Sequence, residues 1–509
     1  MTANATARTV PLKSPASQPQ RPLTRIRHWR GTLPIALGVF GFLASFIGSW
    51  IPSYWGDEAA SVMSAERSLP SLFRMLGHVD AVHGTYYVFL HFWIGAFGAS
   101  EISTRLPSAI GAGFVVAGTF LVGQRLARRS VGIAAALVCA VLPRVVYLGG
   151  ETRSYAFSTA IAVWLTFLLL ELVRRRSSSR WAWAGYAVGT AAGLYMFLYL
   201  GLLILVHGAY LISSRQFAPF RRRWIQAVAL STVLALPIAW FGYLERSQIA
   251  FLAHRNYVSA LNILVLQWLG NGFLAVVAWA FVLLALTSAV VAWRRWRERS
   301  ELIVLTTLWV VIPTVALLAL SIVDPTYNLR YLSFSAPGLA LLVVAGVFRL
   351  RARWLKAAAL GTVIALAIPT DIGEREPYAM DHGSDLAQTA ALVGAQAHPG
   401  DAIVFDESTR PSRRLRLMLH LYPSDFAGVS DVTLRKSYRK RDGLWDTIWP
   451  LDLVSERLNG VNTVWLVELA GSADYANGTD ARTLEDLGYS EKSKQTVNRA
   501  IIYKYSEGT

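Results

Sequence analysis

Long apolar runs, repeated along the first 370 residues and separated by clusters of arginine, constrain this chain more than any other feature. A run of about 17–25 apolar residues is long enough to cross a bilayer as a helix. Hydrophobic residues make up 54% of the 509 residues and charged residues only 16%, whereas a typical soluble domain has about 25% charged residues. The sequence therefore predicts a polytopic α-helical membrane protein.

The arginine clusters predict the orientation of these helices, because Lys and Arg gather in cytoplasmic loops. The clusters lie at residues 125–129, 174–180, 215–223, 294–299 and 349–353. From residue 131 onward the apolar runs between clusters come in pairs, and a last run leads outward. We expect about eleven spans in the plasma membrane, with the N-terminus in the cytosol. This topology accounts for the net charge of +17, so we expect no nucleic acid partner.

The two ends of the chain differ from its apolar middle, residues 33–370, which would form the transmembrane domain. Residues 1–32 are basic, contain no acid and are rich in Pro, Ser, Thr and Gln, which predicts a disordered cytosolic tail. Residues 371–509 are polar and predict a small extracytoplasmic α/β domain. Its strand patterns lie at 402–405, 464–467 and 501–503, and a helical pattern lies at 385–396.

The stretch at residues 53–105 breaks the regular pairing of apolar runs. It contains an apolar run of only about 14 residues, 85–98, the length expected of a re-entrant or interfacial segment. We therefore predict one long external loop here. Asp57 and Glu58 stand at its start, where the first span reaches water.

Polar residues gather at the outer ends of the predicted spans, which a bundle would bring together. A carboxylate among arginines suits a reaction with a phosphate leaving group, because the carboxylate takes a proton from the attacking hydroxyl and guanidinium groups bind the phosphate. The candidates are Asp57, Glu58, Asp80, His83, Tyr86, Tyr87, Arg144, Glu151, Arg153, Tyr155, Glu245, Arg246, His254, Arg255, Asp324, Tyr327, Asn328, Arg330 and Tyr331.

Simpler explanations fit the same residues. Asp57 is a suitable cap for a helix that begins just after it. Glu151 and Arg153 fit an ordinary interfacial ion pair, which is worth little. Arg330 fits a side chain that reaches lipid headgroups, and His83 fits an interfacial polar residue.

Four segments resemble the motifs of GT-C membrane glycosyltransferases, most closely those of the protein O-mannosyltransferase and aminoarabinose transferase group. They are Trp55–Ala59, Phe97–Ala109, Pro143 with Glu151–Ala156, and Asn328–Leu332 with Pro337 and Gly338. The resemblance extends over about residues 33–350. At His83 and Gly84 the chain departs from the family pattern, in which many relatives carry a proline pair, and this departure leaves acceptor specificity open.

The resemblance implies a GT-C fold and an inverting glycosyltransferase that uses a polyprenyl-phosphate sugar as donor. The sugar would be mannose or arabinose, and the acceptor a cell-envelope glycan, lipid or protein at the outer face of the membrane. Asp57 would be the catalytic base, supported by Glu58, and Arg153 and Arg330 would hold the donor phosphate. The remaining assignments are His83, Tyr87, Glu151, Tyr155 and Tyr331 for substrate binding, and Glu101 and Arg105 for bracing the loop.

Two other functions stay open at this stage: a transporter or flippase of lipid-linked envelope intermediates, and a non-catalytic assembly protein. A transporter would need charges near the middle of the bilayer and often an inverted repeat, and the sequence shows neither. We expect no cofactor, because neither the nine histidines nor the single cysteine, Cys139, shows the spacing of a metal site, although a divalent cation stays open. Cys139 itself is expected to be a small buried hydrophobe.

Overall fold

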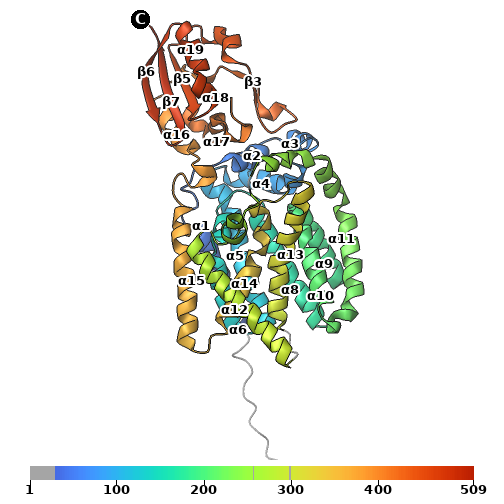
Figure 1. Ribbon diagram of the computed structural model, residues 1–509. Helices are drawn as coiled ribbons and strands as arrows, with labels where there is room; N and C mark the ends of the chain where they lie inside the picture. The colour runs from blue at the N-terminus through green and yellow to red at the C-terminus, as the bar shows by residue number, and fades with distance from the viewer. Residues whose placement is uncertain (1–28, 256, 297–299, 509) are drawn as a thin grey trace, which may run out of the picture.

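The computed structural model describes residues 29–255, 257–296 and 300–508. Helices form a bundle, and a small sheet domain covers one end of it (Figure 1). The predicted disordered tail lies outside the described residues except for residues 29–32. Those four residues belong to the first helix, α1, which begins at Trp29.

The helices of the bundle are apolar and range in length from 7 to 27 residues. They are α1 (Trp29–Phe46), α5 (Glu101–Leu126), α6 (Arg129–Ala140), α7 (Pro143–Gly149), α8 (Tyr155–Arg174), α9 (Arg180–Met196), α10 (Leu202–Ile212), α11 (Ala218–Leu244), α12 (Gly272–Trp296), α13 (Glu301–Val323), α14 (Ala336–Val347) and α15 (Arg353–Gly373). The long apolar runs of the sequence coincide with these helices, and the run that begins at residue 131 covers the pair α6 and α7.

Among the described residues, seven helices are long and apolar enough to cross a membrane, or up to eight if the bent pair α6–α7 counts as one span. The 63° bend in this pair lies at Pro143, whose ring cannot continue a regular helix. Two shorter apolar helices occupy 31–46 and 198–212. The chain is thus a multi-pass membrane protein, and the total of about eleven spans stays a prediction.

The stretch predicted as a long loop forms three helices that lie between the bundle and the sheet domain (Figure 1). They are α2 (Gly56–Ala65), α3 (Leu69–Leu76) and α4 (Gly84–Phe97). The sequence predicted the short α4 as an interfacial segment, and its 14 residues fall below the length of a span.

The C-terminal domain is built on a mixed sheet in the order β2-β1-β5-β7-β6, with β1 parallel to β2 and β5, and β7 antiparallel to β5 and β6. Its elements are α16 (Leu386–Gly394), β1 (Ala402–Phe405), α17 (Met418–Leu421), β2 (Ser430–Asp431), β3 (Leu434–Lys436), β4 (Thr447–Ile448), β5 (Thr463–Leu469), α18 (Ala473–Asn477), α19 (Thr479–Asp486), β6 (Tyr489–Thr496) and β7 (Ala500–Glu507). All three predicted strands are present. The sequence did not predict β6, because this edge strand is almost entirely polar. It did not predict β2, β3 or β4 either, because a strand of two or three residues is too short to show a pattern.

The sheet domain shares a hydrophobic core with α2 and the residues before it. Tyr54, Val62 and Met63 pack in one cluster with Phe405 and Trp465 of the sheet. This shared core fixes the start of α2 between the bundle and the sheet domain.

A buried side chain at the end of α2 strengthens the same contact. The guanidinium group of Arg67 donates to the backbone carbonyl groups of Arg441, at 2.9 Å, and Gly443, at 2.5 Å. Ser71 donates to the carbonyl of Arg439 at 2.6 Å. The α2–α3 segment is therefore attached to the C-terminal domain by polar as well as apolar contacts.

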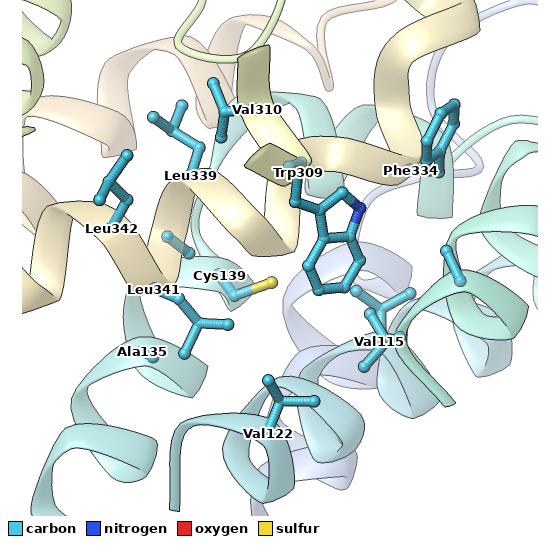
Figure 2. Close-up of a cluster of buried hydrophobic side chains, with 14 of the residues drawn as sticks. Val115, Val122, Ala135, Cys139, Trp309, Val310, Phe334, Leu339, Leu341 and Leu342 are labelled. Atoms are coloured by element: carbon cyan, nitrogen blue, oxygen red, sulfur yellow. The ribbon is translucent and has the colours of Figure 1, made fainter. Parts of the chain in front are cut away.

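The core of the bundle is closely packed and apolar. Figure 2 shows Cys139 among Trp309, Leu341 and their neighbours. Cys139 is fully buried, and Thr119 donates to its sulfur at 3.6 Å. The interpretation of this cysteine as a small buried hydrophobe is confirmed.

Candidate active site

Asp57 lies in the first turn of α2, between the bundle and the sheet domain. The helix is preceded by Trp55, and no side chain caps it, so the explanation of Asp57 as a helix cap is wrong. Gly56 makes this position possible, because a Cβ there would lie 1.9 Å from the carbonyl oxygen of Ser412 in the C-terminal domain. The close approach of the two backbones brings that domain against the residue next to Asp57.

Arg330 is the direct partner of the Asp57 carboxylate. Its Nη2 donates to Asp57 Oδ2 at 2.9 Å, and the two side chains are 18% and 31% exposed. The short 3₁₀ helix η7 (Leu329–Ser335) carries Arg330, and the Asn328 side chain caps it. The guanidinium lies 4.6 Å from the ring centre of Trp55. Arg330 therefore faces the site and does not reach toward lipid headgroups.

Arg153 approaches Asp57 from the segment between α7 and α8. It is buried, and its Nη1 donates to the Asp57 backbone carbonyl at 3.2 Å and to Ser61 at 3.3 Å. Burial alone raises the pKa of the Asp57 carboxyl, but the charges of Arg330 and Arg153 outweigh it and hold this pKa below its ordinary value. Asp57 is therefore ionised at neutral pH.

His83 lies on the other side of Arg153. The distance from Arg153 Nη2 to His83 Nε2 is 3.2 Å, and because a guanidinium can only donate, His83 Nε2 accepts. Burial, with the charge of Arg153 in addition, lowers the pKa of His83 to about 4. His83 is thus a neutral imidazole with its proton on Nδ1.

Tyr87 lies behind His83 and supports the turn that carries it. It is fully buried, and its hydroxyl donates to Asp80 Oδ2 at 2.7 Å. Asp80 has a left-handed backbone, with φ of 60°, and the carboxylate of Glu245 accepts from the next amide, Ala81, at 3.0 Å. In this structure Tyr87 positions the His83 turn and does not face open space.

Glu58 points away from Asp57, into the protein. Its side chain is 0% exposed and forms two bonds with Arg105, Nε to Oε1 at 2.8 Å and Nη2 to Oε2 at 2.6 Å. The amide of Thr152 also donates to Oε1, at 2.8 Å. Arg105 further binds the backbone carbonyls of Ser49 and Pro52, so it braces the loop as expected. Both oxygens of Glu58 are occupied by protein groups, so its side chain helps to hold α2 in place.

Glu151 is buried beside Arg330, at 1% exposure. Its Oε2 lies 3.9 Å from Arg330 Nη1, and among the described residues neither of its oxygens has a hydrogen-bond partner. Arg153 approaches Glu151 only through a backbone bond, so the simple ion pair between them is not formed. Burial, opposed in part by the charges of Arg330 and Arg153, raises the pKa of Glu151 to about 7.

Aromatic rings form a wall next to the charged groups. Tyr155 lies 5.9 Å from the Arg330 guanidinium and packs edge-to-face on Phe197. Tyr331 stacks on Tyr199 at 4.8 Å. The sequence predicted Tyr155 and Tyr331 but missed Phe197 and Tyr199. Those two residues lie in the break between α9 and α10, where the only signal was a cluster of aromatics.

The site thus combines one partly exposed carboxylate, two arginines and an aromatic wall. A carboxylate of this kind can accept a proton, and the arginines can bind an anion such as a phosphate. Within the described part of the chain, no group of three or more His, Cys, Asp or Glu side chains could hold a metal ion. The arrangement suits a group transfer in which the leaving group departs as an anion.

Part of the chain matches a known family. Residues 85–242 match the family model described as dolichyl-phosphate-mannose-protein mannosyltransferase. The matched segment contains Arg153, Glu151 and Tyr155, whereas Asp57 and Arg330 lie outside it. No curated protein matches the chain.

Solved structures with low sequence identity share the architecture over nearly the whole chain. ArnT from Cupriavidus metallidurans in the apo state is 13% identical, with a TM-score of 0.57 over 93% of this chain and 97% of that one. The same protein bound to undecaprenyl phosphate is 12% identical, with a TM-score of 0.55 over the same shares. AglB from Archaeoglobus fulgidus, in complex with an inhibitory peptide and a dolichol-phosphate, is 11% identical, with a TM-score of 0.51 over 94% of this chain and 74% of that one. The chain therefore has the GT-C fold of membrane glycosyltransferases, with a small C-terminal sheet domain, as its motifs predicted.

Proposed function

We propose that the chain is an inverting glycosyltransferase that moves one sugar from a polyprenyl phosphate to an acceptor hydroxyl. The observation that carries the proposal is the contact between the Asp57 carboxylate and the Arg330 guanidinium, with Arg153 on the other side of Asp57. A carboxylate that can accept a proton and two guanidinium groups that can bind a phosphate thus lie together. The ArnT structure bound to undecaprenyl phosphate and the AglB structure bound to dolichol-phosphate support a donor of this class.

The reaction is a single displacement. The acceptor oxygen forms a bond to the anomeric carbon as the bond from that carbon to the phosphate oxygen breaks. The hydroxyl proton passes to Asp57, and the electron pair of the broken bond goes to the phosphate, where Arg330 and Arg153 stabilise the charge. Because attack comes from the face opposite the leaving group, the configuration inverts.

The other groups position this machinery. Glu58 and Arg105 fix the start of α2, and Tyr87 supports the turn of His83. Glu151, Tyr155 and Tyr331 are proposed to contact substrate beside Arg330. We place this end of the bundle outside the cytosol, because the arginine clusters between spans gather at the other end.

Mannose is the first sugar to test, since the matched family model describes mannosyltransferases, and arabinose is the second. The acceptor is proposed to be a glycan, lipid or protein of the cell envelope. The purified chain can be incubated with envelope extracts and a panel of labelled polyprenyl-phosphate sugars. This experiment identifies the donor sugar and the acceptor.

The decisive experiment compares the wild-type chain with Asp57→Asn. Glu376→Gln is the matched control, because Glu376 is an exposed carboxylate beyond the end of α15, on the same side of the bundle. We expect labelled product from wild type and Glu376→Gln and a loss of about 10²–10⁴-fold in Asp57→Asn. If Asp57→Asn transferred sugar at the wild-type rate, Asp57 would be excluded as the base. If the chain moved intact lipid-linked sugar across a vesicle membrane and formed no product, the result would favour a flippase.

A further inference from the structure

A cavity of about 300 Å³ lies at the end of the bundle opposite the proposed active site. Helix α5 begins beside α4 and runs for 26 residues, about 39 Å, before it reaches this cavity at Leu126. Four of the membrane-spanning helices have an end here: α5 and α8 finish at the cavity, and α11 and α13 begin there. The cavity therefore lies where the spans meet water.

Three arginines line the cavity, and they retain unused hydrogen-bond donors. Arg125 pairs with Glu171, but its Nε is buried without a hydrogen-bond partner in the described chain. Arg174 donates through Nη1 to the carbonyl of Arg125 at 3.1 Å. Arg176 follows the end of α8 in a left-handed conformation, with φ of 47°, and no described residue pairs with its guanidinium.

Glu301, the one acid that lines the cavity, forms no ion pair with these arginines in the described chain. Glu301 accepts from Gln216 at 2.7 Å through Oε1 and from Tyr210 at 3.2 Å through Oε2. Each of its oxygens is thus already bound by a neutral group. The lining therefore carries three positive charges and one negative charge, and the free donors belong to the arginines.

The rest of the lining is apolar. Phe217, Phe220 and Leu170 lie beside the charged groups, and Tyr210 packs on Phe217 at 4.8 Å. Arg174 and Arg176 are exposed, and together with Arg125 they line a space that has an apolar wall and lies at the end of the spans.

We propose that this cavity binds the phosphate-bearing headgroup of an anionic phospholipid. Arg174, Arg176 and Arg125 would bind the phosphate, and Phe217 and Phe220 would contact the glycerol and the first acyl carbons. A basic pocket between membrane helices is a known means of binding acidic lipid headgroups. The volume of about 300 Å³ is large enough for a phosphoglycerol group, given about 30 Å³ for a water molecule. The site does not depend on the proposed transferase activity.

The test measures thermal unfolding of the full chain in detergent with added phosphatidylglycerol or phosphatidylcholine. Phosphatidylglycerol is expected to raise the melting temperature by several degrees more than phosphatidylcholine, because it binds only the folded chain. The double variant Arg174→Gln, Arg176→Gln should lose most of this lipid-induced shift. Arg222→Gln is the matched control, since Arg222 is an exposed arginine of α11 that does not line the cavity, and it should keep the shift.

Only the lipid-induced shift is compared, so a general loss of stability in the double variant does not affect the result. An equal shift with phosphatidylcholine would overturn the proposal, as would a double variant that keeps the full shift or a control that loses it. Soluble glycerol phosphate at the same concentration should give little shift. A full shift with glycerol phosphate would mean that the site binds a free phosphate and not a lipid.

Discussion

At the scale of single residues, the central feature is that Arg330 already binds the carboxylate that the proposed reaction uses as a base. A donor phosphate and Asp57 would compete for the same guanidinium. Binding of the phosphate would free Asp57 and remove the charge that holds its pKa down. Donor binding would therefore increase the basicity of Asp57 before an acceptor reacts.

This competition predicts the behaviour of donor binding in Asp57→Asn. The variant is expected to bind polyprenyl phosphate several-fold more tightly than wild type, because Arg330 no longer leaves an ion pair worth about 1 kcal/mol. Equilibrium binding of labelled polyprenyl phosphate to both proteins measures this. Glu376→Gln should bind as wild type does. Weaker binding by Asp57→Asn would show that Asp57 and the phosphate do not share Arg330.

Glu151 predicts a dependence of stability on pH. Its pKa is raised to about 7 in the folded chain from an ordinary 4.5, so the folded state holds the proton more tightly than the unfolded state does. The stability contributed by the protonated form is complete below about pH 4.5 and is lost as the pH rises toward 7, with a loss of at most about 3 kcal/mol. The melting temperature of wild type minus that of Glu151→Gln should therefore be lower at pH 8 than at pH 5. A difference in melting temperature that is constant from pH 5 to pH 8 would contradict this.

At the scale of elements, one buried ion pair joins α2 to α5. Glu58 and Arg105 are both 0% exposed and bind each other through two hydrogen bonds. Removal of one partner leaves the other charge buried and unpaired. The position of the Asp57 backbone, one residue before Glu58, depends on this pair.

We expect Glu58→Ala and Arg105→Ala each to destabilise the chain by about 3–5 kcal/mol, and the double variant to cost less than their sum. Unfolding measured in detergent for a double-mutant cycle tests this. The exposed pair of Arg74 and Asp442, at 52% and 56% exposure, is the control and should contribute no more than about 1 kcal/mol. Additive losses for Glu58 and Arg105 would show that they act independently.

At the scale of the whole molecule, the C-terminal domain is part of the structure around Asp57. It shares its core with α2, and its backbone at Ser412 contacts Gly56. The sequence predicted this domain as a separate unit with no stated role. Its contacts indicate that it determines where α2 begins.

Gly56→Ala tests this role. The added Cβ would meet the Ser412 carbonyl at 1.9 Å, about 1.5 Å short of ordinary contact, so one of the two segments must shift. Transfer is expected to fall by about 10²-fold, since a displacement near 1 Å can cost that much. Gly95→Ala is the control, because nothing lies within 4 Å of its Cβ. Equal activity of the two variants would show that the domain does not position Asp57.

Sequence patterns were sufficient to predict those features of the fold that depend on local composition. Apolar runs located the helices of the bundle, and three strand patterns located β1, β5 and β7. The role of the carboxylate in the motif at Trp55–Ala59 stays a prediction. Polar edge strands and very short strands gave no local signal. The aromatic residues between α9 and α10 were missed for a related reason, since their role depends on a neighbour, Tyr331, far along the chain.

The sequence by itself determined that this chain is a multi-pass helical protein with an acidic motif after its first apolar helix, because hydropathy and charge act residue by residue. Only the tertiary structure decided which acid faces the site. Asp57 and Glu58 are adjacent and chemically alike, but one meets Arg330, 273 positions away, and the other meets Arg105. Successive residues of a helix point in different directions, so packing against other elements assigns each carboxylate its partner.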